Sequence, residues 1–425
     1  MMENAPLVGS GASASLLLGR KLDSIPFSIY HVQIILVLGV VGFVEGYDVA
    51  LGGSLLVLAK EPLHLPPEQI RWLAVAPLLV IRLLTGFGAG FAVAAPFPIA
   101  AELMPAQHRR TYGAIYEVML ASAFTLLPFV GFVLAGNPEG FRLIALPGGL
   151  ALGVVPLLVH FGLPESPRWH LSRGNTKAAV EAVNRMIAHS GGRIPPLTIA
   201  ALGTGPETVR EALPPIKALF GPGQLRWTLI GTACFAAGTT AYYCCAILLP
   251  KALIDQGAAV TLSFGLSTLM FMVTIPGKFF TGFIMEIIGR RWTITYCFAG
   301  AIPGLALMAL AHRTGDYATV AMSAGVIITG LTVLSSFTAV RVYLSEQFPT
   351  ALRGRGHFFG EATARIFSGV LVPYLLEPYT GSATIFFGTI AVVVAIGACV
   401  PLLFGKETVG QLEMVTGAAP ELGKA

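Results

Sequence analysis

Long apolar runs separated by short polar connections dominate the chain. Each run is about 20 residues or longer and almost free of charge, which is the length and character of a helix that crosses a bilayer. Strands of a membrane barrel would instead alternate apolar and polar positions over about ten residues. The pattern predicts membrane-spanning helices at 31–55, 72–104, 112–135, 142–163, 227–250, 262–287, 292–312, 318–345, 357–378 and 383–404.

A short motif occurs twice, each time where one apolar run ends and another begins. The spacing Glu-x2-Pro-x3-Arg begins at Glu102 and returns at Glu346, and a further acid follows each copy at the same distance, as Glu117 and Glu361. A repeat of this length in so apolar a chain predicts two related helical bundles, a plan shared by many transporters. The two copies consist of Glu102, Pro105, Arg109, Glu346, Pro349 and Arg353.

The two bundles are unequal in length. Counted back from the shared Glu, the second begins near Trp227, about 119 residues upstream, and the first begins near Gln33, about 69 residues upstream. The first bundle is therefore short by about 50 residues, enough for two membrane helices and a loop. We predict an all-α membrane protein of two pseudo-repeated bundles, with about ten helices, four plus six, in place of twelve.

Polar segments divide the chain. Residues 164–226 form the one long polar connection, in which Val180, Val183 and Ile187 have helical spacing. This spacing predicts a short amphipathic helix, either on the inner membrane surface or as a solvated linker. The predicted organisation is a cytoplasmic N-terminal segment at 1–30, an N-terminal bundle at 31–163, the central loop at 164–226, a C-terminal bundle at 227–404 and a cytoplasmic tail at 405–425.

Charge and composition support the membrane assignment and give an orientation. Hydrophobic residues make up 55% of the chain and charged residues only 12%, about half the charged share of a soluble domain. Most of the 27 basic residues fall on the side that holds both termini, and this side is expected to be cytoplasmic. The net charge of +5 therefore reflects topology and requires no nucleic-acid partner. We expect an integral protein of a plasma or inner membrane.

A glycine-rich loop joins two apolar runs on the cytoplasmic side. Its pattern, Gly-Lys-x3-Gly-x3-Glu-x2-Gly-Arg-Arg, resembles the signature loop of the major facilitator superfamily. In that family, contacts of the acid in this loop with arginines or with a neighbouring helix end latch the two bundles on the cytoplasmic face. The resemblance implies a gating role, and the alternative is a basic anchor at a span end. The residues concerned are Gly277, Lys278, Gly282, Glu286, Gly289, Arg290 and Arg291.

Other segments extend the resemblance and also show a departure from it. Residues 164–169, Pro-Glu-Ser-Pro-Arg-Trp, resemble the segment after the sixth helix in sugar-porter-like and organic-acid branches. The Glu-x2-Pro-x3-Arg copies resemble the ends of the family's fourth and tenth helices. A complete member carries the glycine-rich loop in both halves, but here residues 72–80 resemble the start of a second helix and lead directly into 81–90, which resemble a fourth. The resemblance therefore implies an internal deletion of the second and third helices.

Ionisable residues inside predicted spans mark a candidate site, because a charge at bilayer depth is costly unless it faces a partner or a polar cavity. Glu45-Gly-Tyr-Asp48 resembles the acid-Gly-aromatic-Asp motif of aromatic-acid/proton symporters. The two acids are three residues apart and share a helix face. The resemblance implies that Glu45 and Asp48 bind the proton, and the alternative is a structural hydrogen-bond network.

Further polar residues surround this candidate. Arg82 matches the fourth-helix Arg of the family and could pair with the acids, bind a substrate carboxylate or snorkel outward. Arg365 lies one turn from Glu361, as an intrahelical pair or as a substrate contact. Lys278 and Arg341 lie near inner span ends, where we expect snorkelling or latching. Substrate or proton contacts are assigned to Glu45, Asp48, Arg82, Glu117, Tyr242, Tyr243, Glu361 and Arg365, with aromatic packing as the alternative for both tyrosines.

The resemblance implies a secondary carrier that works by alternating access and cotransports protons with a small organic acid, aromatic acids included. The alternatives are a carrier of sugars or other neutral metabolites and an internally deleted protein without transport activity. An enzyme is not expected, since the sequence has no convincing nucleophile–base grouping and no Gly-x4-Gly-Lys-Ser/Thr loop for ATP. The five cysteines have no metal-ligand spacing, so neither a metal nor a cofactor is predicted. The expected partners are a small-molecule substrate, protons and the bilayer.

Overall fold

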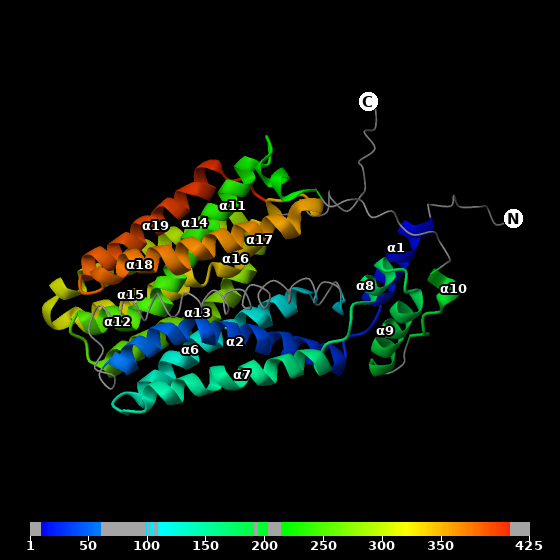
Figure 1. Cartoon of the computed structure of the whole chain (residues 1–425). Coiled ribbons are helices and arrows are strands. Elements are labelled where there is room, and N and C mark those ends of the chain that lie inside the picture. Colours follow the sequence, from blue (N-terminus) through cyan, green and yellow to red (C-terminus); the bar gives the residue numbers. More distant parts are fainter. Residues whose placement is uncertain are drawn as a thin grey trace. The chain divides into compact units, whose positions relative to one another are not determined.

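The computed structural model of the chain describes residues 10–60, 99, 103–105, 109–190, 194–202 and 214–408. Throughout these ranges the regular structure is helical, without a strand (Figure 1). The N-terminal helices are α1 (Ser10–Asp23), α2 (Ile29–Lys60), α6 (Arg109–Leu134), α7 (Gly140–Gly162), α8 (Pro167–Ser172), α9 (Thr176–His189) and α10 (Ile199–Leu202). The C-terminal ones are α11 (Leu225–Tyr243), α12 (Leu249–Asp255), α13 (Val260–Ile287), α14 (Arg290–Leu310), α15 (Ala318–Thr329), α16 (Phe337–Glu346), α17 (Thr350–Ile366), α18 (Val372–Leu376) and α19 (Ala383–Phe404).

Eight helical stretches of the described residues are long and apolar enough to cross a membrane. Each coincides with one of the ten predicted spans, to within a few residues at either end. The predicted span 357–378 is also helical, through α17 and α18, but it carries charged side chains. The predicted span 72–104 lies almost wholly outside the described residues. The all-α membrane fold is confirmed, whereas the count of ten and the deletion remain predictions.

The chain forms two compact units, and α2, α6 and α7 contribute residues to both. Unit 1 comprises 1–42, 91–119 and 150–212, and unit 2 comprises 43–90, 120–149 and 213–425. The division into bundles and loops expected from the sequence is not tested by this clustering and stays a prediction.

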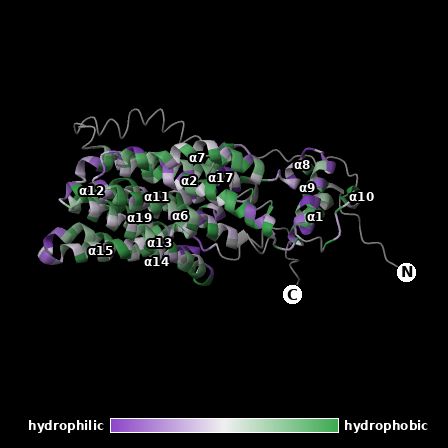
Figure 2. Cartoon of the chain, turned by 90° about the horizontal axis from the view of Figure 1, so that it is seen from below, coloured by the Kyte–Doolittle hydropathy of each residue, from purple (hydrophilic) through white to green (hydrophobic). Residues whose placement is uncertain are grey.

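Unit 1 contains a small helical cluster made of α1, α8, α9 and α10, which pack on one another. These helices carry more hydrophilic positions than the long helices (Figure 2). Val183 and Met186 of α9 are buried in one core with Leu18 and Leu22 of α1. The predicted amphipathic helix is therefore present and its apolar face packs against protein, while its place on the membrane surface or in a solvated linker stays a prediction. The partner helix α1 was not anticipated, because residues 1–30 were assigned only as a cytoplasmic segment.

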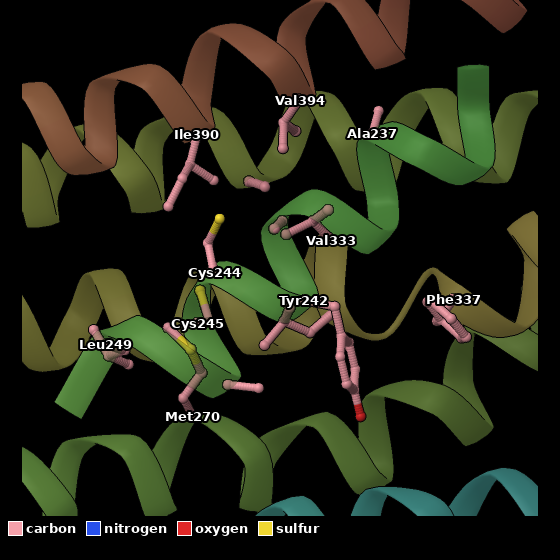
Figure 3. Close-up of a cluster of buried hydrophobic side chains, with 14 of the residues drawn as sticks. Ala237, Tyr242, Cys244, Cys245, Leu249, Met270, Val333, Phe337, Ile390 and Val394 are labelled. Atoms are coloured by element: carbon pink, nitrogen blue, oxygen red, sulfur yellow. The ribbon is translucent and has the colours of Figure 1, made fainter. Parts of the chain in front are cut away.

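Unit 2 has α11 near its centre, in contact with α16, α17 and α19, while α14 packs on α15 and α19. Three π-helical turns interrupt its helices, at Cys244–Leu248, Gly330–Leu334 and Phe367–Leu371. Such turns often occur next to functional sites. Cys244 and Cys245 lie among apolar side chains such as Met270 and Ile390 (Figure 3), so they contribute to packing.

Glycines allow two close helix approaches within unit 2. A Cβ at Gly46 would lie 2.8 Å from the carbonyl oxygen of Leu120, and one at Gly53 would lie 2.2 Å from that of Ile247. Any larger side chain at either position would have to push backbone aside. These contacts hold α2 close to α6 and to the π-helical turn that follows α11, and Glu45 stands on α2 directly before the first of them.

Candidate functional site

Arg365 connects two buried carboxylates from different helices. Its Nη1 lies 3.0 Å from Oε1 of Glu45 on α2, and its Nη2 lies 2.8 Å from Oε1 of Glu361 on α17. The side chains of Glu45 and Glu361 are only 3% and 6% exposed. The intrahelical pair expected from the four-residue spacing is present, and the same guanidinium also reaches an acid 320 positions away. Glu45, Arg365 and Glu361, with the two neighbours described next, are called the central cluster.

Arg341 and His357 complete the central cluster around Glu361. Arg341 Nη2 lies 3.4 Å from Glu361 Oε1, and His357 Nε2 lies 3.2 Å from Glu361 Oε2. Sequence reasoning did not assign His357 to the site. Its position one turn before Glu361 was the available signal, because residues four apart meet on one helix face.

The charges of the central cluster balance. Two carboxylates, Glu45 and Glu361, face two guanidinium groups, Arg341 and Arg365. Buried charges strongly favour such pairing, and removing one partner of a buried pair costs about 3–5 kcal/mol. A change of one proton or one bound anion would therefore alter the stability of the whole group.

An aromatic cluster adjoins the central cluster. The Tyr242 ring lies 4.7 Å from Phe124, 5.6 Å from Phe271 and 5.3 Å from Phe337, centroid to centroid. Lys278 Nζ lies 5.6 Å from the centroids of both Tyr242 and Phe337. Figure 3 shows Tyr242 and Phe337 among the side chains of the apolar core. For Tyr242, aromatic packing is thus realised, and a cation is held beside it.

Lys278 and Arg341 are more deeply placed than the sequence indicates. Lys278 is 3% exposed and Arg341 is 5% exposed, and Arg341 lies 4.9 Å above the Phe337 ring. Neither side chain snorkels to the surface, which corrects that expectation. The favourable interaction of a cation with a ring face explains how both are accommodated in an apolar bundle.

The other acids and the tyrosines occupy different positions. Asp48 lies one turn beyond Glu45 on α2 and is half-buried, while Glu117 is buried in unit 1. The Tyr47 hydroxyl donates a 2.7 Å hydrogen bond to the carbonyl oxygen of Ile144, which ties α2 to α7. Tyr243 is 8% exposed on α11. The predicted site residues Arg82 and Glu102 lie outside the described residues.

The glycine-rich loop between α13 and α14 forms a second charged group. Arg290 lies 3.1 Å from Glu286 and 3.5 Å from Glu346, and its backbone amide donates to Glu407 at 2.9 Å. Arg291 donates to the carbonyl oxygens of Pro401 and Leu402, at 2.8 and 2.6 Å. We call the group of Glu286, Arg290, Glu346 and Glu407 the peripheral cluster.

The glycines of this loop have separate structural roles. Gly289 has φ +96°, a left-handed conformation that strongly favours glycine. A Cβ at Gly277 would lie 2.0 Å from the Ser335 hydroxyl oxygen, so this glycine permits close packing of α13 on its neighbour. A Cβ at Gly282 would meet no atom of the described residues within 4 Å.

The repeated motif marks the start of a helix in both copies. Pro349 precedes α17 in an extended conformation and Arg353 lies in its first turn, while Arg109 begins α6 and Pro105 is buried just before it. Pro fits a helix start because its fixed φ suits the first turn and its missing amide is not needed there. The expectation that the motif joins two helices is met wherever the structure describes it.

A sequence profile described as the Major Facilitator Superfamily matches residues 49–373. The chain belongs to the major facilitator superfamily. It is 24% identical over 337 residues to the niacin transporter NiaP of Acinetobacter baylyi, covering 79% of this chain and 74% of that protein. It is 26% identical over 355 residues to the inner membrane metabolite transport protein YgcS of Escherichia coli, covering 80% and 73%.

Solved structures agree at the level of the fold. The inward-open conformation of the xylose transporter XylE from E. coli has a TM-score of 0.58 and 18% identity, covering 95% of this chain and 89% of that one. The major facilitator superfamily is a family of membrane transporters, so the predicted class, an integral membrane transport protein, is confirmed. The substrate and the coupling ion are not given by this membership.

Proposed function

We propose that the chain is a secondary active transporter that couples a proton to the movement of a small organic acid by alternating access. The observation that carries the proposal is the contact of Arg365 with both Glu45 and Glu361, in a buried group whose charges balance. Charged groups inside a membrane bundle are retained where they serve ion or substrate pathways. The proposed division of labour assigns the proton to Glu45 and the substrate carboxylate to Arg365.

The proposed coupling follows from charge balance. When a proton neutralises Glu45, one face of the Arg365 guanidinium loses its counter-ion, while Glu361 still holds the other. A substrate carboxylate can then take the vacated place, since a guanidinium binds carboxylates in a planar fork. The loaded site has the same net charge as the empty one. Proton and anion therefore favour each other's binding, which is the linkage that symport requires.

Two observations support an aromatic acid as the substrate. The rings of Tyr242 and Phe337 lie beside Lys278, and an aromatic acid carries both a ring for stacking and a carboxylate for a cation. NiaP is named for niacin, an aromatic acid. A neutral sugar is the second candidate, because the D-xylose–proton symporter shares the fold.

The peripheral cluster is assigned to gating on the cytoplasmic side, with both chain termini in the cytoplasm. It joins the α13–α14 loop to the end of α16 and to the segment after α19. Breaking and remaking such contacts would change the relative stability of the two access states. This orientation rests on the distribution of Lys and Arg.

The proposal is tested by uptake into proteoliposomes with an imposed inward proton gradient. The panel contains aromatic acids, aliphatic acids and neutral sugars, and the variants are Glu45→Gln, Arg365→Gln and the control Glu139→Gln. Glu139 forms a matched acid–arginine pair with Arg142, but in an exposed position. We expect proton-driven uptake of an acid by the wild type and the control, and its loss in the other two.

Three other outcomes would contradict parts of the proposal. Uptake of a sugar alone would favour the neutral-metabolite alternative. Proton-driven uptake that survives Glu45→Gln would remove Glu45 from coupling. Absence of uptake with every compound, followed by uptake after about 50 residues of a related second and third helix are restored at Val80, would identify this chain as an internally deleted carrier without activity.

A further inference from the structure

A cavity of about 350 Å³ lies at the end of the C-terminal helices, away from the central cluster. Its wall includes Gln224 and Trp227 from the start of α11, Glu346 and Gln347 after α16, Arg353 of α17 and Lys406 after α19. Its volume is within the range of small-molecule sites. Neither the transport mechanism nor the peripheral cluster accounts for this space.

Two positively charged side chains, Arg353 and Lys406, line the cavity. In the described part of the chain, Arg353 has no ion-pair partner, and its Nε is buried without a hydrogen bond. Lys406 lies with Nζ 4.6 Å from the centroid of the Trp227 ring, an interaction that leaves its three donors available. Glu346, the acid among the described residues of the wall, is already engaged by the hydroxyl of Thr408 and lies 3.5 Å from Arg290.

The start of α17 adds to the positive electrostatic potential of the cavity. The helix has 17 residues, and Pro349 at its N-cap makes no side-chain hydrogen bond. The first amides of such a helix lack internal acceptors and carry partial positive charge, which favours anions.

Gln347 is an independent indication of a ligand. It is 2% exposed and lines the cavity, while its Oε1 has no hydrogen-bond partner. Its Nε2 donates to the carbonyl oxygen of Tyr343 at 3.1 Å. A buried side-chain oxygen without a donor is uncommon and calls for a bound group, and a hydroxyl or a protonated phosphate oxygen would satisfy it.

We infer that this cavity binds a phosphate-bearing anion, with Arg353 and Lys406 as the charged contacts and the first turn of α17 as the backbone contact. The phosphate has two possible sources, a lipid headgroup or a soluble phosphate compound. Trp227 is the type of residue found at the headgroup level. The bound anion would join α11, α16, α17 and the segment after α19 at one point.

The consequence is an effect on the C-terminal helices that does not involve the transported substrate. Arg290 and Glu346 of the peripheral cluster lie beside the cavity wall, so occupancy would stabilise the arrangement in which these contacts are formed. A ligand that binds one arrangement more tightly shifts the population toward it. The inference can be tested without knowing the substrate, so it stands or falls separately from the proposed function.

The test is binding measured by thermal unfolding of the full chain at constant ionic strength. Inorganic phosphate is titrated in detergent against chloride, and nanodiscs of phosphatidylglycerol are compared with nanodiscs of phosphatidylcholine. The variants are Arg353→Gln/Lys406→Gln, Lys406→Gln alone and the control Lys217→Gln, which removes an exposed charge of the same polar region. We expect saturable stabilisation of the wild type and the control by at least one probe, and about tenfold weaker binding in the double variant.

Each result either supports or overturns the inferred anion site. Stabilisation by inorganic phosphate identifies a soluble ligand, and stabilisation by phosphatidylglycerol alone identifies a lipid headgroup. If the double variant does not fold, Lys406→Gln decides, because Lys406 follows the last helix, and it must weaken binding relative to Lys217→Gln. Equal binding in the cavity variants and the control, or no stabilisation of the wild type by either probe, would overturn the inference.

Discussion

The central and peripheral clusters of unit 2 both pair glutamates with arginines, in different surroundings. In the central cluster, Glu45 and Glu361 are almost fully buried and are balanced by two guanidinium groups. In the peripheral cluster, Glu286 is 31% exposed, although Arg290 and Glu346 are only 10% and 6% exposed. Three acids surround Arg290, and its neighbour Arg291 binds backbone carbonyls instead. Screening by water makes exposed pairs weak. We propose that the central cluster responds to one proton, whereas the peripheral one acts as a contact that can open.

The largest effect is expected for Arg365→Gln. This change leaves two buried carboxylates without their shared guanidinium, at a cost of about 3–5 kcal/mol in the free energy of unfolding. We expect a large fall in the thermal midpoint in detergent together with loss of uptake. Arg365→Lys is the control that keeps the charge and loses the planar fork. If Arg365→Gln unfolds at the wild-type temperature, the guanidinium is not balancing these acids.

Arg290→Gln should have an intermediate effect. Arg290 is 10% exposed on its side chain and contacts Glu286, Glu346 and the carbonyl oxygen of Met285. Hydrogen bonds to charged groups contribute about 1.5–3 kcal/mol each at most, and part of this is recovered by solvent. We expect a smaller fall in the thermal midpoint than for Arg365→Gln. We also expect slower exchange of the organic acid between vesicle compartments. An equal or larger fall would reverse the ranking of the two clusters.

Gly289→Ala tests the backbone of the peripheral cluster. Gly289 has φ 96° and ψ 161°, a region adopted essentially by glycine alone, so an L-residue there costs about 1–3 kcal/mol. The new Cβ would also meet the flexible carboxylate of Glu407. The thermal midpoint should fall modestly, and Gly282→Ala is the matched control because its Cβ meets open space. Equal midpoints for the two variants would contradict this account of the loop.

The smallest effect is expected for Glu139→Gln. Glu139 and Arg142 lie 2.8 Å apart but are 58% and 68% exposed. Exposed pairs contribute about 0–1 kcal/mol, so stability and uptake should both stay near the wild-type values. A loss of uptake here would show that short acid–arginine distances alone do not identify the functional pair.

The sequence predicts the helices better than it predicts their partners. Eight spans agree with the structure because the thickness of a bilayer imposes run length directly. Glu361 and Arg365 were paired correctly from their spacing, but Glu45 lies 320 positions from Arg365. Helical periodicity tells which residues share a face and not which helices become neighbours. His357 was within reach of the same four-residue argument that found Arg365.

Two sets of contacts do not follow from the sequence, for a common physical reason. The apolar face of the amphipathic helix α9 is buried in one core with residues of α1. Lys278, for which snorkelling or latching is expected, lies against Tyr242 and Phe337. In both cases the sequence shows what a side chain needs, an apolar neighbour or a stabilised charge. It does not show that another part of the chain supplies it.

The most direct test of the proton assignment is a comparison of two modes of transport in Glu45→Gln. The variant carries a neutral side chain in place of the acid to which we assign the proton. We expect it to retain exchange of the organic acid between vesicle compartments and to lose accumulation driven by a proton gradient. Accumulation at the wild-type level would contradict the assignment, because the proton would then be carried by another group.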